Sequence, residues 1–356
     1  MARGTETADK IALAQSANRA AMACSGKAPA DTASQLAADG LIGVLVPEAP
    51  GGLDLGLAEA AVIAEAAGRS ELAFPLVEEM LLAGLLASSH PAIAADVIAG
   101  NTIVTLAWSG RLQARRTDGA WQLHGAVARI PMARSADYLL APADLGSEGI
   151  GGVLLGVGKL VEALRPTTDL EADIPYYELA LHGAAVPAGA VIADPAAIAT
   201  LYRNGSLLRA ADMLGVGKIA FETACEYVKT RRQFGKPLAA FQSVKHRLAR
   251  DHVGLLNTER SLAYAAQCVD EESGEAELAC LVAAAVAGES CRRAAESAMH
   301  LHGAIGQTRD LPLHRYLRRI HASLERAEPA AFRALLADRL LAINNAAFAG
   351  AHPALS

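Results

Sequence analysis

The chain has 356 residues, of which 52% are hydrophobic but only 4% aromatic, so its core must be built mainly from aliphatic side chains. Its formal net charge of −6 argues against a nucleic-acid partner, which requires clustered Lys and Arg. No window reaches the roughly 20 unbroken apolar residues of a membrane span. The start of the chain, from Met1 to Lys10, is polar and unlike a secretory signal. We therefore expect a cytoplasmic protein with no membrane segment.

The first segment, residues 1–100, is a series of Ala- and Leu-rich helical patterns with one interruption. Two prolines and paired glycines between Val46 and Gly52 cannot continue a helix. From Leu57 to Gly68 the apolar residues return at helical spacing. This segment is predicted to be an N-terminal helical domain.

The second segment, residues 101–194, changes to the pattern of short strands. Runs of β-branched or aliphatic residues occur at 102–106 and 153–155. Asp118-Gly119 lies between two further runs and is typical of a hairpin turn. Gly and Pro recur throughout, so we expect a middle β domain folded as a small barrel or sandwich.

The third segment, residues 195–356, is helical and nearly free of helix breakers. Four stretches exceed the length of an average helix, at 196–230, 242–269, 276–302 and 329–346. Long amphipathic helices joined by short connections predict an antiparallel four-helix bundle. The expected fold class is therefore α+β but mainly α, in the order helices, strands, helices.

The five cysteines have the distribution of small buried hydrophobic residues. No two of them form a CxxC pair, and three lie in helical patterns among aliphatic residues. We therefore expect neither a metal site nor a disulfide. They are Cys24, Cys225, Cys268, Cys280 and Cys291.

Two motifs in the third segment carry a resemblance to a known family. From Arg231 to Leu238 the chain reads RRQFGKPL, followed by a glutamine at Gln242, and residues 300–306 read HLHGAIG. They resemble the R-x-x-F-G-x-x-L and Q-x-x-G-G-x-G segments of acyl-CoA dehydrogenases. The loop at residues 43–53 is similar to one in the same enzymes, and the resemblance covers about residues 35–345 in the family's own domain order.

The residue types in these motifs suit a dinucleotide. A planar guanidinium such as that of Arg231 can bind pyrophosphate oxygens through paired hydrogen bonds. Phe234 offers a flat apolar face to an adenosine, and Gln242 can donate and accept hydrogen bonds at once. Taken singly, each residue is equally well explained as a solvated helix end, a core anchor or a turn former. Taken together at the family's spacing, they indicate a flavin site.

The resemblance implies that the two segments bind the ADP half of an FAD whose ring lies in a neighbouring subunit. It also implies an acyl-CoA substrate and, as electron acceptor, an electron-transfer flavoprotein or another carrier. The implied cofactor-binding residues are Arg231, Gln233, Phe234, Gln242, His300, Gly303, Ala304 and Gly306.

The catalytic base of the family is missing from its usual positions. Most members place a Glu before a Gly-Thr pair beyond an arginine-rich helix start, but here residues 323–330 read SLERAEPA. Glu325 and Glu328 flank that position and are better explained as surface or capping residues. Other members use a Glu on an earlier helix, and ungapped counting from Arg231 puts Gly205 there. This glycine is expected in a loop or at a helix start.

The residues that would surround the flavin ring are depleted as well. The family's Thr-Glu-Pro and Gly-Ser-Asp segment is shortened here to AWSG around Trp108, and its Trp-Ile-Thr strand reads RIPM at 129–132. Pro131 removes a backbone donor, and Arg129 replaces an aromatic face with a cation. Trp108 is expected to be a core or hairpin residue. Arg209 is expected to be a solvated helix charge, with contact to an anionic group of the substrate as the alternative.

These observations predict a subunit of a heteromeric FAD-dependent acyl-CoA dehydrogenase. A homologous partner chain would supply the ring pocket and the base, so no catalytic residue is assigned here. The chain is similar in this to the two-subunit enzymes of actinobacterial sterol side-chain breakdown, which implies lipid metabolism and a heterotetramer. Two alternatives are a self-sufficient homotetrameric dehydrogenase or oxidase that uses Glu325 or Glu328 as base, and a flavin-free scaffold that only stabilises a partner.

Overall fold

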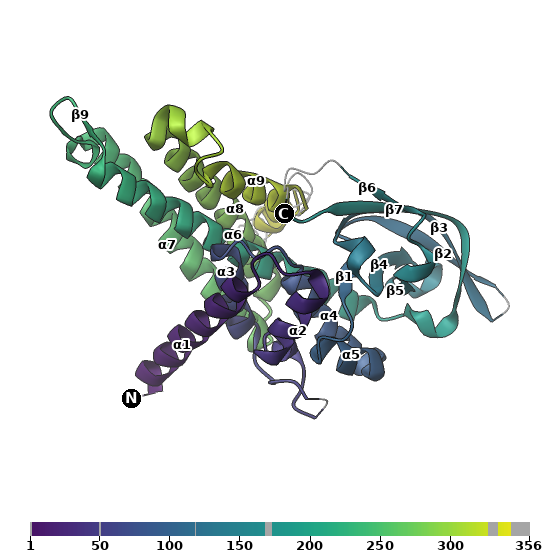
Figure 1. Ribbon diagram of the computed structural model, residues 1–356. Coiled ribbons are helices and arrows are strands. Elements are labelled where there is room, and N and C mark those ends of the chain that lie inside the picture. The colour runs from purple at the N-terminus through teal and green to yellow at the C-terminus, as the bar shows by residue number, and fades with distance from the viewer. Residues whose placement is uncertain (1, 50, 118, 168–172, 327–333, 343–356) are drawn as a thin grey trace, which may run out of the picture.

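The computed structural model describes residues 2–49, 51–117, 119–167, 173–326 and 334–342. Helices lie at both ends of the chain with a sheet between them, and the sheet and the long C-terminal helices extend to opposite sides (Figure 1). The predicted fold class and the order helices, strands, helices are confirmed.

The N-terminal region is helical, as expected. Proline occupies the first helical position of two of its helices, where the missing N–H costs no helical hydrogen bond. A third helix is capped at its N-terminus by a residue distant in the sequence. The N–H groups of Leu57 and Ala58 donate to the carboxylate of Asp270 at 2.7 and 3.1 Å. The helices are α1 (Ala2–Ala23), α2 (Pro29–Ala38), α3 (Leu57–Arg69), α4 (Leu76–Ser89) and α5 (Pro91–Ile98).

The strands of the middle region form one sheet in the order β6-β7-β3-β2-β4-β5-β8, with β1 paired to β4. The expected hairpin joins β2 and β3, whose last pair is Thr117 with Ala120. The strands are β1 (Val104–Leu106), β2 (Ser109–Thr117), β3 (Ala120–Pro131), β4 (Tyr138–Asp144), β5 (Ile150–Gly156), β6 (Leu164–Pro166), β7 (Tyr176–Pro187) and β8 (Val191–Ile192).

The C-terminal region contains the longest helices of the described chain. The first is capped by Asp194, whose carboxylate accepts a hydrogen bond from the N–H of Ala197 at 3.0 Å. Of the predicted stretch 329–346, residues 334–342 are helical and the rest lies outside the described residues. The helices are α6 (Pro195–Thr230), α7 (Gln242–Asp270), α8 (Ala276–His302) and α9 (Leu313–Arg326).

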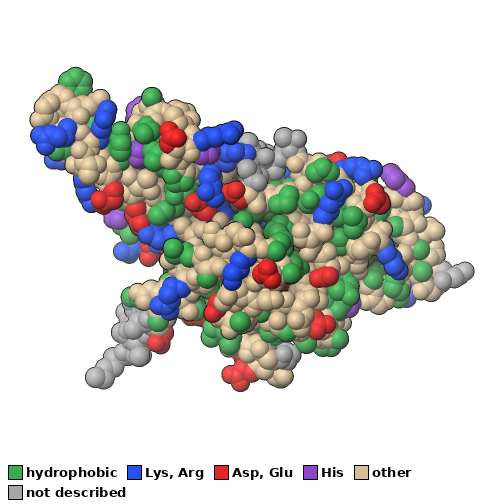
Figure 2. Space-filling model, viewed as in Figure 1, with side chains coloured by type: hydrophobic (Ala, Val, Ile, Leu, Met, Phe, Trp, Pro, Cys, Tyr) green, Lys and Arg blue, Asp and Glu red, His purple; other side chains and the backbone are tan. Residues whose placement is uncertain are grey.

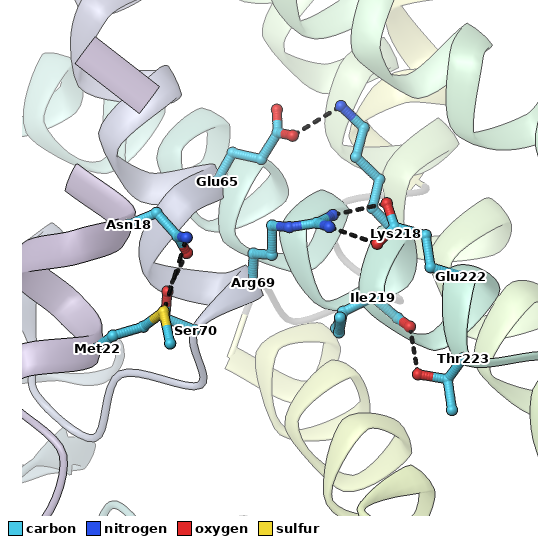
Figure 3. A network of polar contacts seen from close by, with 9 residues as sticks. All are labelled: Asn18, Met22, Glu65, Arg69, Ser70, Lys218, Ile219, Glu222 and Thr223. Atoms are coloured by element: carbon cyan, nitrogen blue, oxygen red, sulfur yellow. Dashed lines mark hydrogen bonds and ion pairs between the residues drawn. The ribbon is translucent and has the colours of Figure 1, made fainter. Parts of the chain in front are cut away.

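A polar network joins the N-terminal helices to α6 (Figure 3). The guanidinium of Arg69 on α3 pairs with the carboxylate of Glu222 on α6. Lys218 on α6 lies 2.7 Å from the carboxylate of Glu65 on α3. These side chains are partly exposed, so each pair contributes only about 0–1 kcal/mol. Their main effect is to fix how α3 lies along α6.

A buried ion pair holds α9 against α6. Arg319 Nη2 lies 2.6 Å from Asp212 Oδ1, and Arg319 Nε donates to Asp212 Oδ2 at 3.2 Å. The same guanidinium donates to the carbonyl oxygen of Leu72 at 2.9 Å. Because the geometry is bidentate and a third acceptor is present, the cost of burying both charges is offset.

Among the described residues, no helix is long and apolar enough to cross a membrane. No group of His, Cys, Asp and Glu in that part of the chain could hold a metal ion. All five cysteines are free thiols, and four of them are buried.

Candidate cofactor site

The connection between α6 and α7 forms a short hairpin at the far end of the bundle (Figure 1). Its strands are β9 (Arg232–Gln233) and β10 (Lys236–Pro237), which pair antiparallel. The N–H of Leu238 donates to the carbonyl of Arg231 at 2.9 Å and closes the base of the hairpin. The predicted residues of this segment, Arg231, Gln233, Phe234 and Gln242, are all exposed.

Phe234 at the tip of the hairpin has a backbone conformation that phenylalanine rarely adopts. Its φ is +52°, and that of Gly235 is +78°. Glycine adopts this region freely, whereas a bulky residue is strained there by about 1–3 kcal/mol. The residue is 90% exposed, and its ring makes an edge-to-face contact with Phe241 at 6.2 Å between centroids, which offsets only part of the strain. A strained and largely exposed aromatic ring indicates a residue with further contacts outside this chain.

The second predicted segment follows the end of α8. Gly303 ends the helix with φ +66°, and Gly303–Gln307 form a short 3₁₀ turn, η7. Gly306 is buried, and a Cβ there would lie 2.6 Å from the carbonyl oxygen of Met299. The remaining predicted residues, His300, Gly303 and Ala304, are exposed.

Contact between the last turns of α6 and α8 brings the two segments to the same end of the bundle. Tyr227, four residues before Arg231, stacks on His302, with ring centroids 4.0 Å apart and ring planes at 24°. His302 directly precedes Gly303. The sequence analysis missed this pair, although helical spacing puts Tyr227 one turn before the arginine.

This end of the bundle fits the ADP half of a dinucleotide. Figure 2 shows Lys and Arg side chains around it, and a guanidinium can bind pyrophosphate oxygens in pairs. No atom of the described residues lies within 4 Å of a Cβ built on Gly235 or Gly303, so a ligand can approach the backbone closely. Exposed cations of the hairpin and of the first turn of α7 are Arg231, Arg232, Lys236 and Lys245.

The region between the sheet and α4 and α6 is filled by the chain's own side chains. Trp108, between β1 and β2, is a core residue as predicted, and its Nε1–H donates to Glu78 Oε1 at 2.6 Å. The indole packs against Gly205, where a Cβ would lie 2.5 Å from its Cη2 atom. Tyr202 meets the indole edge to face, with ring centroids 5.8 Å apart.

Two expectations for this region are wrong. The sequence predicts Gly205 in a loop or at a helix start, whereas it lies inside α6, because the indole of Trp108 occupies the space of its missing side chain. The sequence predicts Arg209 as a solvated charge, whereas it is buried. Its guanidinium lies 4.0 Å above the Trp108 ring and pairs with Glu78, and both contacts stabilise the buried cation.

A small cavity lies beside Glu78 and Arg209. A cavity of ≈ 30 Å³ is lined in part by Glu78, Pro131 and Arg209. A volume of this size holds on the order of two water molecules. This cavity is too small for an acyl thioester.

Two carboxylates near this region make contacts within the chain, although Glu79 Oε2 has no hydrogen-bond partner among the described residues. Glu78 pairs with Arg209, and burial raises the pKa of Glu79 well above its usual value while its Oε1 accepts from the N–H of Val104 at 2.8 Å. Among the weak base candidates, Glu325 lies in the last turn of α9, with a side chain outside the described part of the structure. Glu328 lies outside the described residues.

Comparison with known proteins identifies the class. The chain matches the acyl-CoA dehydrogenase N-terminal domain over residues 5–94 and the acyl-CoA dehydrogenase C-terminal domain over residues 196–324. Acyl-CoA dehydrogenase FadE27 of Mycobacterium tuberculosis is 30% identical over 298 residues, which are 78% of this chain and 79% of that protein. The chain belongs to the acyl-CoA dehydrogenase family, whose proteins bind FAD.

Solved structures support the predicted resemblance to the heteromeric type. The ChsE4-ChsE5 complex from Mycobacterium tuberculosis matches with a TM-score of 0.80 and 27% identity over 88% of each chain. The Tcur3481-Tcur3483 steroid ACAD G363A variant matches with a TM-score of 0.82 and 27% identity over 96% of this chain and 99% of that one. Butyryl-CoA dehydrogenase from Megasphaera elsdenii, at 18% identity and a TM-score of 0.79, shares the fold.

Proposed function

We propose that this chain is one subunit of a heteromeric acyl-CoA dehydrogenase and is active only in that assembly. It contributes the ADP side of the FAD site, while a homologous partner chain contributes the ring pocket and the catalytic base. One contrast supports this proposal. The end of the bundle around Phe234 is open to a ligand, whereas the region around Trp108 is filled.

The chemistry divides between the two chains accordingly. When bound, FAD accepts a hydride from the β-carbon of the thioester, and a base removes the α-proton. In this chain Arg231 would balance the charge of the pyrophosphate, Phe234 would cover the adenosine, and Gly303 would allow the close approach of a phosphate. These residues hold and orient the cofactor without a proton-transfer role. The carboxylate of Glu78 is already paired with Arg209, so we assign it no role as base.

The similarity to the ChsE4-ChsE5 complex and to a steroid ACAD supports a heterotetramer that oxidises a steroid-like acyl-CoA. The electron acceptor of the complex would be an electron-transfer flavoprotein or another carrier. This assignment places the chain in cytoplasmic lipid metabolism.

Co-expression with a longer homologue that carries the Glu-Gly-Thr segment tests the proposal. We expect a yellow complex that oxidises acyl-CoA, whereas this chain alone remains inactive. In that complex, Arg231→Ala with Phe234→Ala should release the flavin, and Arg115→Ala, an exposed arginine on β2, should not.

Three other results would point elsewhere. A colourless complex contradicts the proposal. Flavin absorbance and acyl-CoA-dependent bleaching from this chain alone would favour a self-sufficient homotetramer using Glu325 or Glu328. If the Arg231 and Phe234 substitutions leave the flavin content of the complex unchanged, this chain is better explained as a flavin-free scaffold.

A further inference from the structure

Tyr227 and His302 form the contact between the two cofactor segments, although neither belongs to the predicted set of cofactor-binding residues. Beyond the ring stack at 4.0 Å, the Tyr227 hydroxyl donates to the carbonyl oxygen of His302 at 3.4 Å. The His302 side chain is buried, with 5% of the residue exposed. The pair therefore joins the end of α6 to the end of α8.

His302 is fixed from its own side of the contact. Its Nδ1 lies 2.8 Å from the carbonyl oxygen of Ala298, and because a carbonyl only accepts, Nδ1 carries the proton. The glycine loop folds back over it, since a Cβ on Gly306 would lie 2.9 Å from the His302 Cβ. The ring and the η7 turn are consequently held together.

Tyr227 is connected to the arginine motif through the backbone. Its carbonyl accepts the N–H of Arg231 at 2.8 Å, which is the closing hydrogen bond of α6. The carbonyl of Arg231 then accepts the N–H of Leu238 at the base of the hairpin. The backbone position of Tyr227 therefore determines that of Arg231, at the base of the hairpin.

We propose that the Tyr227–His302 stack is a positioning contact that fixes the distance between the arginine hairpin and the glycine loop. It rests on the proposed function, because it matters only when both segments grip one ADP group. With the distance fixed on folding, binding does not bear the entropic cost of ordering two independent loops. Neither side chain needs to contact the cofactor.

The experiment uses the assembled complex and three probes: FAD, ADP as the half that these segments grip, and FMN as the half that they do not. Tyr227→Leu removes the stack and should weaken FAD and ADP by about tenfold, the upper part of the range for one aromatic pair, with FMN unchanged. Tyr227→Phe keeps the stack and should bind all three as the wild type does.

Phe221 provides a matched control on the same helix. It is half-buried and stacks on His252 of α7, with ring centroids 5.6 Å apart. Phe221→Leu should lower the melting temperature about as much as Tyr227→Leu but leave ADP affinity unchanged. Unchanged ADP affinity in Tyr227→Leu, or an equal loss in Phe221→Leu, overturns the inference.

Arg231→Ala separates this inference from the proposed function. If Arg231→Ala weakens ADP and Tyr227→Leu does not, only the positioning role fails. If neither substitution weakens ADP, the assignment of the ADP site fails with it.

Discussion

The indole ring of Trp108 occupies the space that a side chain at Gly205 would fill. A Cβ on residue 205 would lie 2.5 Å from Cη2 and 3.0 Å from Cζ3 of the indole. A glycine inside a helix costs about 1 kcal/mol relative to alanine. Position 205 lies inside the 36-residue helix α6, and the indole of Trp108 explains why a glycine occurs there. The sequence analysis aligns this position with the catalytic carboxylate of some family members, and in this chain the indole fills the space beside it.

The first prediction tests that fit through a double-mutant cycle. Gly205→Ala should destabilise the chain by about 1–3 kcal/mol through overpacking, although alanine favours helix. In a Trp108→Ala background the same change should be neutral or stabilising, because the indole is gone. Urea unfolding of the four proteins measures the coupling. Equal effects of Gly205→Ala in both backgrounds would show that the ring does not occupy this space.

The sequence alone predicted the bounds of the three long helices α6, α7 and α8 because their ends are marked locally. Pro195 and the hairpin around Gly235 bound α6, and the predicted 196–230 differs from the observed helix by one residue. The arginine and glycine motifs could be located for the same reason. Each is a short run of characteristic residues at a helix end.

The packing around Trp108 could not be predicted in this way. Its partners, Glu78 on α4 and Arg209 on α6, are separated by 131 residues in the sequence. Helical periodicity shows that Arg209 is on a helix but gives no sign of which carboxylate neutralises it. The contact of Tyr227 with His302 is also a long-range one, and motif matching passes over it because neither residue is expected to touch the ligand.

The second prediction concerns Phe234, where stability and cofactor binding should change in opposite directions. Phe234→Gly relieves a positive φ at an exposed position and should stabilise the free subunit by up to about 1 kcal/mol. The same change removes the flat ring and should lower FAD retention in the assembled complex. Thermal unfolding of the subunit and flavin absorbance after gel filtration measure the two effects. A parallel change in both quantities would assign Phe234 a purely structural role.

The third prediction addresses the ion pair between Arg319 and Asp212. Asp212→Asn leaves a buried guanidinium without its counter-charge and should cost about 3–5 kcal/mol in the free energy of unfolding. The control is Arg292→Ala, which breaks two partly exposed pairs within α8, with Glu289 and Glu296, and should cost less than about 1 kcal/mol. Chemical denaturation compares the two variants. A similar small cost for both would mean that water reaches the Arg319 site.

The fourth prediction is a pH dependence that arises from Glu79. Burial raises the pKa of this carboxyl in the folded chain well above the value of 4.5 expected when it is unfolded. The folded state therefore binds the proton of Glu79 more tightly than the unfolded state does. The contribution of Glu79 to the free energy of unfolding is fully present below about pH 4.5 and is lost as the pH rises toward the folded pKa. Glu79→Gln cannot lose a proton and keeps the Oε1 that accepts from Val104. Its free energy of unfolding should decline less between about pH 5 and pH 8 than that of the wild type. Parallel pH profiles for the two proteins would refute this assignment.

The last prediction decides which chain supplies the base. A general base contributes about 10²–10⁴ in rate, so replacing it with the isosteric amide should nearly abolish turnover. In the assembled complex, Glu325→Gln and Glu328→Gln should leave the rate of acyl-CoA oxidation within about twofold of the wild type, whereas Glu→Gln at the partner's Glu-Gly-Thr segment should remove it. Flavin content, measured in each preparation, separates a lost base from a lost cofactor. A large fall in rate at full flavin occupancy for either variant of this chain would show that the base lies at Glu325 or Glu328. That result would favour the self-sufficient enzyme.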